Sequence, residues 1–381
     1  MRKVIGKYKK MKKVLFIVSN IRASNGVTRV VMNHYPDLVE NGYSIDFCSM
    51  YDRPSPWFDE LKENGSNYYL LPQADEKHSG PDYAKSKEFL EKKLTDEKYD
   101  IIHIHITGKY AALAARLAKK AHVPYRIYHA HNPLYIHDIH SALYTLAYHV
   151  PCVRNCNKYL ACSNHAGKSY FGNKKFDVIR NTVDTENVKF DSESRIKLRN
   201  KLGVKDETVV IGTVCRHTKQ KNPFFIVDVF EQYHKKNNDS VLMWVGTGEL
   251  EQEVKKYIGN RGLANAVISM GNQTEMKAMY SAMDLFLLPS LYEGLGIVFI
   301  EAQANGLPVL ASDVVPQDTG VTELIHYVSL KKDAKDWAYE LELCLNNKEI
   351  KKRTLYAEIV RSQGYDKKSN HDLLQYYRSF S

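Results

Sequence analysis

Two glutamates eight positions apart, Glu293 and Glu301, form the most informative chemical pattern in this chain. Their run follows an apolar segment at 285–288 and leads into helical spacing that stops at 306–308, which predicts a strand, a glycine loop and a helix. The free backbone N–H groups at such a helix start can hold a diphosphate. Glu301, about two turns into the helix, could accept hydrogen bonds from a sugar diol, while Glu293 lies in the loop. The alternative is an ordinary junction with solvated carboxylates.

A basic loop lies upstream of this pattern. The segment 209–214 is typical of a fully buried parallel strand, and it runs into a loop that contains Arg216 and Lys221. Two cations at the carboxyl end of a buried strand are costly unless an anion lies near them. Arg216 can form a bidentate contact with a phosphate, and Lys221 can act as a point charge. A solvated basic loop is the alternative.

The elements around these motifs alternate along the whole chain. Strands and helices alternate from 14 to 184 and again from 209 onward, which predicts parallel sheets with covered faces. A length of 381 residues favours two domains. The sequence therefore predicts an α/β protein with two Rossmann-like domains facing a central cleft. The expected domains are 1–185, together with the tail 365–381, and 186–364; the polar stretch 185–205 is a candidate linker.

Both motifs fall at the carboxyl ends of predicted strands, where open α/β sheets bind ligands. Together they resemble the donor site of family-4 glycosyltransferases, which are retaining enzymes of the GT-B fold. The resemblance extends over nearly the whole chain and is strongest with the bacterial exopolysaccharide and capsule branch, through the phrase EAQANGLP at 301–308. It implies that Arg216 and Lys221 grip the donor diphosphate. It also implies that Glu301 holds the ribose and Glu293 the transferred sugar.

Other segments match the same family. The resemblance assigns the helix start at Gly294, Leu295, Gly296 and Ile297 to donor binding, and Gly271 and Asn272 to the turn near the nucleobase. The loop before Gly26 resembles the glycine loop after the family's first strand. Asn25 stands where the family has another glycine, and because asparagine tolerates positive φ, we expect the turn to survive.

Four histidines form two alternating pairs. His103 and His105 share one face of a predicted strand, as do His129 and His131, so either pair could chelate a metal. The second pair lies at the carboxyl end of its strand, where family members place a histidine that contacts the transferred sugar. His131, which is followed by an asparagine, matches that position best; His129 is the alternative. A histidine without a catalytic role is the competing interpretation.

The residue types suggest how the reaction would proceed. Breaking a sugar–nucleotide bond requires stabilisation of the leaving diphosphate, which Arg216 and Lys221 would supply electrostatically. No Asp-x-Asp pair occurs in a suitable loop, so we expect neither a metal nor another cofactor. The resemblance implies retention of the anomeric configuration, through front-face attack by the acceptor hydroxyl. The expected donor is a UDP-sugar and the expected acceptor a saccharide, lipid-linked in the capsule branch.

The amino-acid composition limits the binding partners and the cellular compartment that we expect for this protein. The net charge of +10 calls for nucleic acid, an anionic membrane surface or a phosphorylated substrate, and the densest lysine runs lie in the first half of the chain. No nucleic-acid-binding motif is recognisable. No apolar run approaches a membrane span, the start lacks a secretory signal, and six scattered cysteines favour a reducing compartment. We expect a cytoplasmic protein bound peripherally to the inner membrane face.

Other functions remain open at this level. The same fold could serve a sugar-nucleotide epimerase, a phosphorylase, or a protein that binds sugar nucleotides without turnover. A DNA glucosyltransferase would also have two Rossmann-like halves and positive charge. The apolar residues of 365–381 recur at helical spacing, and the family resemblance implies a final helix that crosses back to the first domain.

Overall fold

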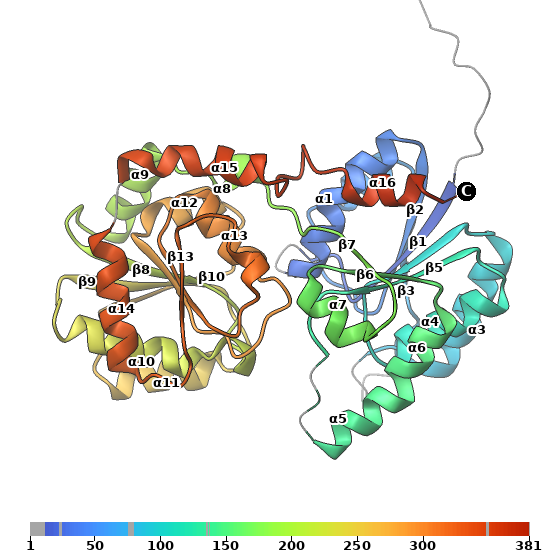
Figure 1. The fold of residues 1–381 in the computed structure, drawn as a ribbon, viewed down its shortest axis with the longest axis horizontal. Helices are drawn as coiled ribbons and strands as arrows, with labels where there is room; N and C mark the ends of the chain where they lie inside the picture. The colour runs from blue at the N-terminus through green and yellow to red at the C-terminus, as the bar shows by residue number, and fades with distance from the viewer. Residues whose placement is uncertain are drawn as a thin grey trace, which may run out of the picture. The chain divides into compact units, whose positions relative to one another are not determined.

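The computed structural model describes residues 12–22, 25–74, 80–134, 136, 138–347 and 350–380. The chain divides into two compact units (Figure 1). Unit 1 contains Met1–Ile179 together with His371–Ser381, and unit 2 contains Arg180–Asn370. Each unit is one parallel sheet with helices on both sides of it. The fold class predicted from the sequence is confirmed.

Unit 1 is built on a seven-stranded sheet in the order β3-β2-β1-β4-β5-β6-β7. Its strands are β1 (Lys12–Val18), β2 (Tyr43–Ser49), β3 (Tyr68–Leu70), β4 (Ile101–Ile104), β5 (Tyr125–Ala130), β6 (Lys158–Ala161) and β7 (Asp177–Val178). Its helical segments are α1 (Gly26–Glu40), α2 (Phe58–Glu63), α3 (Tyr83–Asp96), α4 (Lys109–Lys120), α5 (Ile139–Tyr144), the π-helix η1 (Thr145–His149), α6 (Val150–Asn155), α7 (Asn164–Phe171) and α16 (Asp372–Arg378). The central strands are largely buried, as in the apolar run Val14–Val18 of β1, because helices cover both faces of the sheet.

Unit 2 repeats this plan with six strands in the order β10-β9-β8-β11-β12-β13. Its strands are β8 (Val209–Val214), β9 (Ser240–Val245), β10 (Val267–Gly271), β11 (Leu285–Leu288), β12 (Val309–Ser312) and β13 (Ile325–Val328). Its α-helices are α8 (Thr185–Val188), α9 (Ser192–Leu202), α10 (Pro223–His234), α11 (Glu251–Asn260), α12 (Met276–Ala282), α13 (Ile297–Ala304), α14 (Ala334–Asn346) and α15 (Tyr356–Ser362). Its 3₁₀ turns are η2 (Lys219–Lys221), η3 (Gln317–Thr319) and η4 (Ile350–Leu355).

The strand order of unit 2 reverses between β8 and β11. The chain builds outward from β8 through β9 to β10, then returns to the middle of the sheet and builds the other way from β11. Loops that leave neighbouring strands at such a point diverge, and ligands of open parallel sheets bind there. The loops after β8 and β11 are the ones that carry the basic motif and the two-glutamate motif. Strand topology therefore brings two distant sequence motifs to one place.

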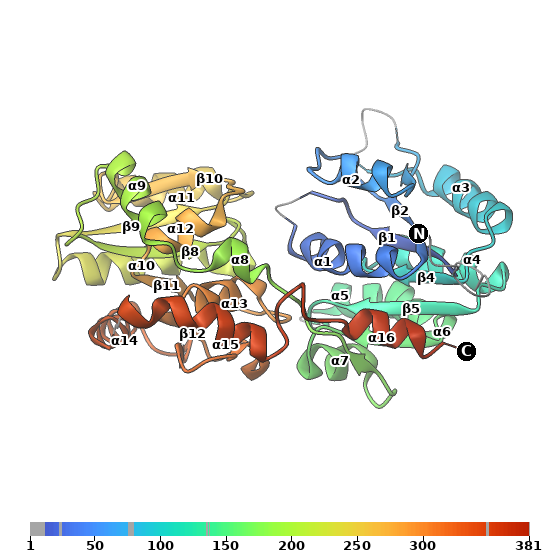
Figure 2. The same ribbon diagram turned by 90° about the horizontal axis from the view of Figure 1, so that it is seen from above.

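Helix α16 belongs to unit 1 although it follows unit 2 in the sequence (Figures 1 and 2). Leu373, Leu374, Tyr377 and Phe380 join the hydrophobic core of unit 1 around Val14 and Phe16, with no more than 5% of any of these side chains exposed. The ring of Phe380 also stacks on that of Tyr125, with centroids 4.1 Å apart. The prediction that the final helix returns to the first domain is confirmed.

The polar stretch 185–205 is not a linker. It forms α8 and α9, and the inner face of α9 carries Arg195 and Arg199 beside Leu198. Both guanidinium groups bind the buried carboxylate of Asp284, at 2.8 and 2.6 Å. Helical periodicity is normally read from apolar residues, so a buried face made of arginines at i and i+4 escapes that reading.

Candidate functional site

The chemical centre of unit 2 is a contact between the two predicted motifs. Lys221 ends the turn η2, and its ammonium forms an ion pair with Glu293 Oε1. Ser290 Oγ donates a hydrogen bond to the same oxygen, at 2.7 Å. Only 13% of the Lys221 side chain and 5% of the Glu293 side chain are exposed. The structure thus brings together two residues that lie 72 positions apart in the sequence.

Backbone contacts hold the two loops at this spacing. The Leu291 amide donates to Gln220 O at 2.8 Å, and Gln220 Nε2 donates to Tyr292 O at 3.0 Å. Ser312 Oγ donates to Ser290 O, which fixes the second loop to β12. A charged group held in place before a ligand arrives needs no reorganisation when charge develops, which is the usual origin of electrostatic catalysis.

Arg216 occupies the same loop but is not neutralised. It lies two residues after Val214, the last residue of β8, and its side chain is exposed. Across the ranges that the structure describes, its guanidinium has no hydrogen-bond or ion-pair partner. Since Lys221 is already paired with Glu293, Arg216 gives this edge of the sheet its uncompensated positive charge. An anion with several oxygens, such as a diphosphate, suits that arrangement.

Two glycines let a second loop approach the basic loop closely. Gly246 has φ +129°, and a Cβ on it would lie 2.2 Å from the Cys215 carbonyl oxygen. A Cβ on Gly248 would lie 2.6 Å from the His217 amide nitrogen. The His217 ring stacks on Trp244, with centroids 4.4 Å apart. The basic loop is therefore packed between fixed neighbours.

The Gly271–Asn272 turn continues the same edge of the sheet. Gly271 has φ +63°, and its carbonyl accepts a hydrogen bond from the Gly246 amide at 2.7 Å. Asn272 Nδ2 donates to Thr247 Oγ1 at 3.0 Å. The structure therefore places this turn beside the glycine turn that follows β9, on the side of β8 away from β11.

Gly296, the N-cap residue of helix α13, has a left-handed conformation with φ +75°, and a Cβ there would lie 2.5 Å from the Phe299 ring. The side chains of Leu295 and Ile297 are 1% and 8% exposed, so these residues offer a ligand mainly their backbone. Together with Gly294 they form the predicted strand–glycine loop–helix junction. This eight-residue helix starts just after the loop in which Glu293 pairs with Lys221, so its N-terminal amides add to the positive field there.

Glu301 lies in the second turn of α13 and is fully buried. The Tyr280 hydroxyl donates to Glu301 Oε2 at 2.7 Å. The carboxylate is therefore anchored from α12 on one side. Tyr280 and Ser290 are site residues that sequence reasoning missed. Ser290 lies three residues before Glu293 at a strand end, which could have signalled it; nothing in the spacing connects Tyr280 with Glu301.

In unit 1, Gly26 begins α1 after the loop that follows β1. The preceding Asn25 caps the helix, since its Oδ1 accepts hydrogen bonds from the amides of Val27 and Thr28. Its φ is −94°, so the expectation of a positive φ at this position is wrong. A capping residue needs an extended backbone for its side chain to reach the first amides, which explains the difference.

The four histidines of unit 1 form a stack at the carboxyl ends of β4 and β5, in which His103, His105 and His129 are buried and His131 is half-buried. His103 and His129 are linked through Nε2 and Nδ1 at 3.1 Å, and His105 and His131 through Nδ1 and Nε2 at 2.8 Å. His103 Nδ1 also lies 2.7 Å from the hydroxyl of Tyr377 in α16. Burial lowers the pKa of all four imidazoles, that of His131 to about 3. The four rings are therefore neutral at physiological pH.

Two features of this stack bear on the predicted roles. His103, His105 and His129 have ring nitrogens within 4.8 Å of one another, which is close enough to share a metal ion. His103 is also hydrogen-bonded to His129 and Tyr377. Ring centroids of neighbouring histidines are 4.0 Å apart for His103 and His105 and 4.3 Å apart for His129 and His131. His131, the predicted sugar contact, uses Nε2 to bind His105.

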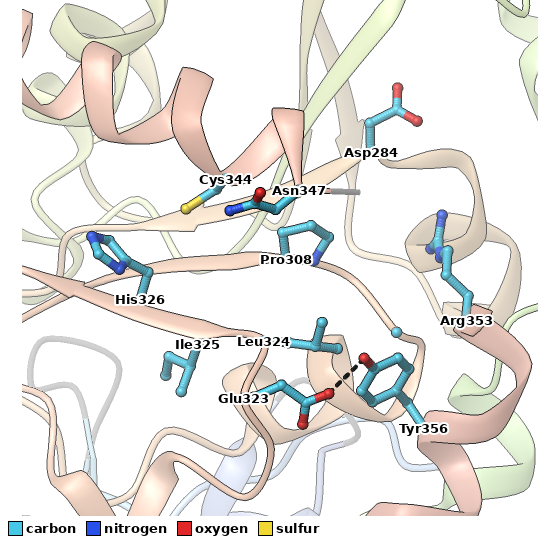
Figure 3. Close-up of a pocket in the computed structure, with 11 residues that line it drawn as sticks. Asp284, Pro308, Glu323, Leu324, Ile325, His326, Cys344, Asn347, Arg353 and Tyr356 are labelled. Atoms are coloured by element: carbon cyan, nitrogen blue, oxygen red, sulfur yellow. Dashed lines mark hydrogen bonds between the residues drawn. The ribbon is translucent and has the colours of Figure 1, made fainter. Parts of the chain in front are cut away.

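A pocket of about 400 Å³ lies at the opposite edge of the unit 2 sheet (Figure 3). Its wall includes Asp284 and Pro308, which precede β11 and β12, and Glu323, which accepts a hydrogen bond from the Tyr356 hydroxyl at 2.8 Å. None of the predicted site residues lines it. The predicted site instead follows the carboxyl ends of β8 to β11, while Gly26 and His131 belong to unit 1.

Comparison with known proteins identifies the family. Residues 24–187 match the model described as Glycosyltransferase Family 4, and residues 194–361 match the one described as Glycosyl transferases group 1. The chain is 25% identical over 371 residues to EpsF of Bacillus subtilis (strain 168), which is named as a glycosyltransferase; the match covers 94% of each chain. It is 28% identical over 308 residues, 76% of each chain, to an Escherichia coli UDP-Gal:alpha-D-GlcNAc-diphosphoundecaprenol alpha-1,3-galactosyltransferase.

Solved structures show the same architecture. The crystal structure of Anabaena Alr3699/HepE in complex with UDP and glucose superposes with a TM-score of 0.75 at 19% identity, covering 97% of this chain and all of that one. WaaG, a glycosyltransferase involved in lipopolysaccharide biosynthesis, gives a TM-score of 0.70 at 16% identity, with 92% of this chain and 94% of that one covered. With its two matched halves and its paired sheets, the chain belongs to glycosyltransferase family 4 and is a glycosyltransferase of the GT-B fold.

Proposed function

We propose that this glycosyltransferase moves a sugar from a UDP-sugar to a lipid-linked saccharide, with retention of configuration, during exopolysaccharide or capsule synthesis. One observation carries the donor half of the proposal. Exposed Arg216, the paired Lys221–Glu293 contact and the start of α13 lie on loops that meet at the switch point between β8 and β11. Cations and helix amides hold the diphosphate, and a carboxylate beside them orients the sugar.

Each residue then has a separate task. Arg216 and Lys221 neutralise the diphosphate, with help from the amides of Gly294 to Ile297. Glu293 orients Lys221 and accepts a hydrogen bond from the transferred sugar. Glu301, anchored by Tyr280, binds the ribose hydroxyls. Gly271 and Asn272 contact the nucleobase of the donor, and Gly26 and His131 contact its sugar.

The chemical step uses no resident cofactor. The acceptor hydroxyl oxygen forms a bond to the anomeric carbon on the face that the diphosphate leaves. The bond from that carbon to the diphosphate oxygen breaks, and the hydroxyl proton passes to the same leaving oxygen. Arg216, Lys221 and a helix start supply the charge stabilisation that a divalent metal supplies in other transferases, so the proposed reaction needs no metal.

The acceptor class is supported by one relative and by charge. The name of the Escherichia coli relative specifies a UDP-sugar donor and an acceptor joined to diphosphoundecaprenol. A positively charged chain suits such an acceptor, which is anionic and held at a membrane. No helix in the described part of the chain is long and apolar enough to cross a bilayer. We place the enzyme peripherally on the cytoplasmic face.

The test is a hydrolysis screen of the purified protein over UDP-, GDP- and dTDP-sugars, since slow donor hydrolysis needs no acceptor. We expect turnover of one UDP-sugar, release of the sugar in its original anomeric form by NMR, and the same rate with EDTA. Tight UDP binding without turnover of any donor would indicate a binding protein instead. Arg216→Ala should abolish most of the activity, while Lys219→Ala, in the same loop, serves as the matched control.

A further inference from the structure

A row of apolar side chains stands exposed on α5, η1 and the residue Ile136 that precedes them in unit 1. Helix α5, the π-helix η1 and helix α6 follow one another without a break, and Figure 1 shows the α5 end projecting away from the sheet. Of the thirteen large apolar side chains that are exposed among the described residues, five fall within eleven positions. They form what we name the apolar ridge: Ile136, Ile139, Leu143, Tyr144 and Leu146, each between 51% and 69% exposed.

The ridge has a firm base. Helix α6 buries Cys152 and Val153 in unit 1, whereas α5 and η1 bury no side chain. The Tyr144 hydroxyl rests against Gly108, where an added Cβ would lie only 1.9 Å from it. The absence of a Cβ at the start of α4 therefore lets the ridge dock there. The side chains of the ridge are therefore exposed on a helix that is held in place at its base.

The helix changes its winding where it leaves the sheet. Pro151 lacks the N–H that an α-helical ladder needs, and the turn just before it is a π-helix in which the Val150 amide donates to Thr145 O. Such turns re-aim the side chains that precede them. Tyr144 and Tyr148 lie on this stretch, with ring centroids 4.9 Å apart in an edge-to-face arrangement.

The part of the sequence around the ridge is strongly basic. Residues 101–179 contain ten lysines and arginines against two aspartates and no glutamate. The charge of Lys109 acts on the phenol of Tyr144, so at least one cation borders the ridge. Eight of the ten basic side chains are exposed: Lys109, Arg116, Lys119, Lys120, Arg154, Lys168, Lys174 and Lys175.

We infer that the apolar ridge inserts into the interface of an anionic bilayer. Exposed aliphatic side chains on a short helix, tyrosines whose rings combine an apolar body with a polar tip, and cations without matching acids are the features that hold a helix in the plane of a membrane surface. The inference rests on the proposed function only in that a lipid-linked acceptor gives the docking its purpose.

The experiment compares the vesicle binding of the wild type, one triple variant and one double variant. In the ridge variant, Ile139, Leu143 and Leu146 become serine. In the control variant, Ile196→Ser and Leu355→Ser remove side chains of unit 2 that are 58% and 59% exposed. Vesicles contain phosphatidylcholine alone or mixed with phosphatidylglycerol. We expect the wild type and the control to sediment with the anionic vesicles, and the ridge variant to bind them at least tenfold more weakly.

Direct insertion has its own readout. A Leu143→Trp variant should show a blue-shifted emission with anionic vesicles and quenching by brominated acyl chains. High salt should weaken binding of the wild type without abolishing it, because the apolar contribution is not screened. Equal vesicle binding by the ridge variant would overturn the inference. So would a dimer in lipid-free solution that the three serines dissociate, since the ridge would then be a subunit interface.

Donor hydrolysis separates this inference from the proposed function. The three serines lie outside every catalytic and binding assignment, so the ridge variant should hydrolyse the donor at the wild-type rate. A wild type that turns over no nucleotide sugar, yet needs the ridge to bind vesicles, would refute the enzymatic proposal and leave the membrane inference standing. Normal donor hydrolysis with no vesicle binding by the wild type would refute the membrane inference and leave the enzymatic proposal standing.

Discussion

Lys221 and Glu293 are largely buried and share one contact, so neither charge can be removed without leaving the other uncompensated. The structure shows Glu293 holding the ammonium in place. In the function proposed above, donor binding would share this ammonium between the carboxylate and a phosphate oxygen. The pair therefore acts as one unit, and the consequences of altering its two members are not additive.

A double-mutant cycle tests this coupling. Lys221→Met and Glu293→Gln should each slow donor turnover by about 10²-fold or more, the loss typical of removing a preorganised charge at a leaving group. The double variant should lose much less than the product of the two effects. The measurement is kcat for donor hydrolysis, with Lys219→Ala as the reference. Strictly multiplicative losses would show that the two residues act independently.

Glu301 should govern nucleotide affinity instead of turnover. Glu301→Gln keeps the shape of the buried side chain but weakens its hydrogen bonds to the ribose, so UDP should bind at least tenfold more weakly by calorimetry. Tyr280→Phe should produce a smaller loss in the same direction because it removes the anchoring hydroxyl. Glu293→Gln should not weaken the binding of free UDP, because it leaves the Lys221 ammonium free to pair with the diphosphate. Equal UDP affinity for wild type and Glu301→Gln would remove the ribose assignment.

The helices and loops show how much of this site could be predicted from the sequence. Strands that are apolar on both faces identified the sheets, and a strand–glycine–helix pattern identified the start of α13. Partners that approach through the fold, such as Tyr280 for Glu301, leave no trace in local spacing. Apolar spacing does not predict helix α9 because its buried face carries Arg195 and Arg199. The apolar residues of α5 and η1 give no amphipathic signal either, since none of them is buried.

The glycine turn after β9 offers a prediction at this scale. Gly246→Ala would place a Cβ against the Cys215 carbonyl in a backbone conformation that side chains rarely adopt, so it should destabilise the protein by about 1–3 kcal/mol and weaken UDP binding. Gly259→Ala is the control, because it lies in helix α11 with nothing within 4 Å of the added Cβ, and it should stabilise the protein slightly. Both effects are measured by urea denaturation.

At the scale of the whole molecule, the histidine stack makes stability depend on pH. Its imidazoles stay neutral in the folded protein but take up protons in the unfolded chain below their ordinary pKa of 6.5. Stability is therefore full above pH 6.5 and declines as the pH falls toward the folded pKa of His131, about 3. We expect the free energy of unfolding to drop steeply across this range.

One substitution isolates a single member of the stack. Removing the titrating ring with His131→Asn should flatten the pH slope by up to about 1.4 kcal/mol per pH unit between these limits. The exposed His165 in α7 provides a control, and His165→Asn should leave the slope unchanged. Urea titrations from pH 7 down to pH 4 measure both. An identical slope for wild type and His131→Asn would mean that the ring is charged in the fold.

The return of α16 to the core of unit 1 also determines the order in which the two units can finish folding during translation. Unit 2 is one uninterrupted stretch of chain, so it holds all of its own sequence once Asn370 has been translated. Unit 1 is started first but lacks Leu373, Tyr377 and Phe380 until every residue of unit 2 has been synthesised. The usual vectorial order, in which the N-terminal domain folds first, is therefore inverted at its last step. During elongation, the core residues of unit 1 that α16 later covers stay exposed. This makes unit 1 the part of the nascent chain that most needs chaperone binding.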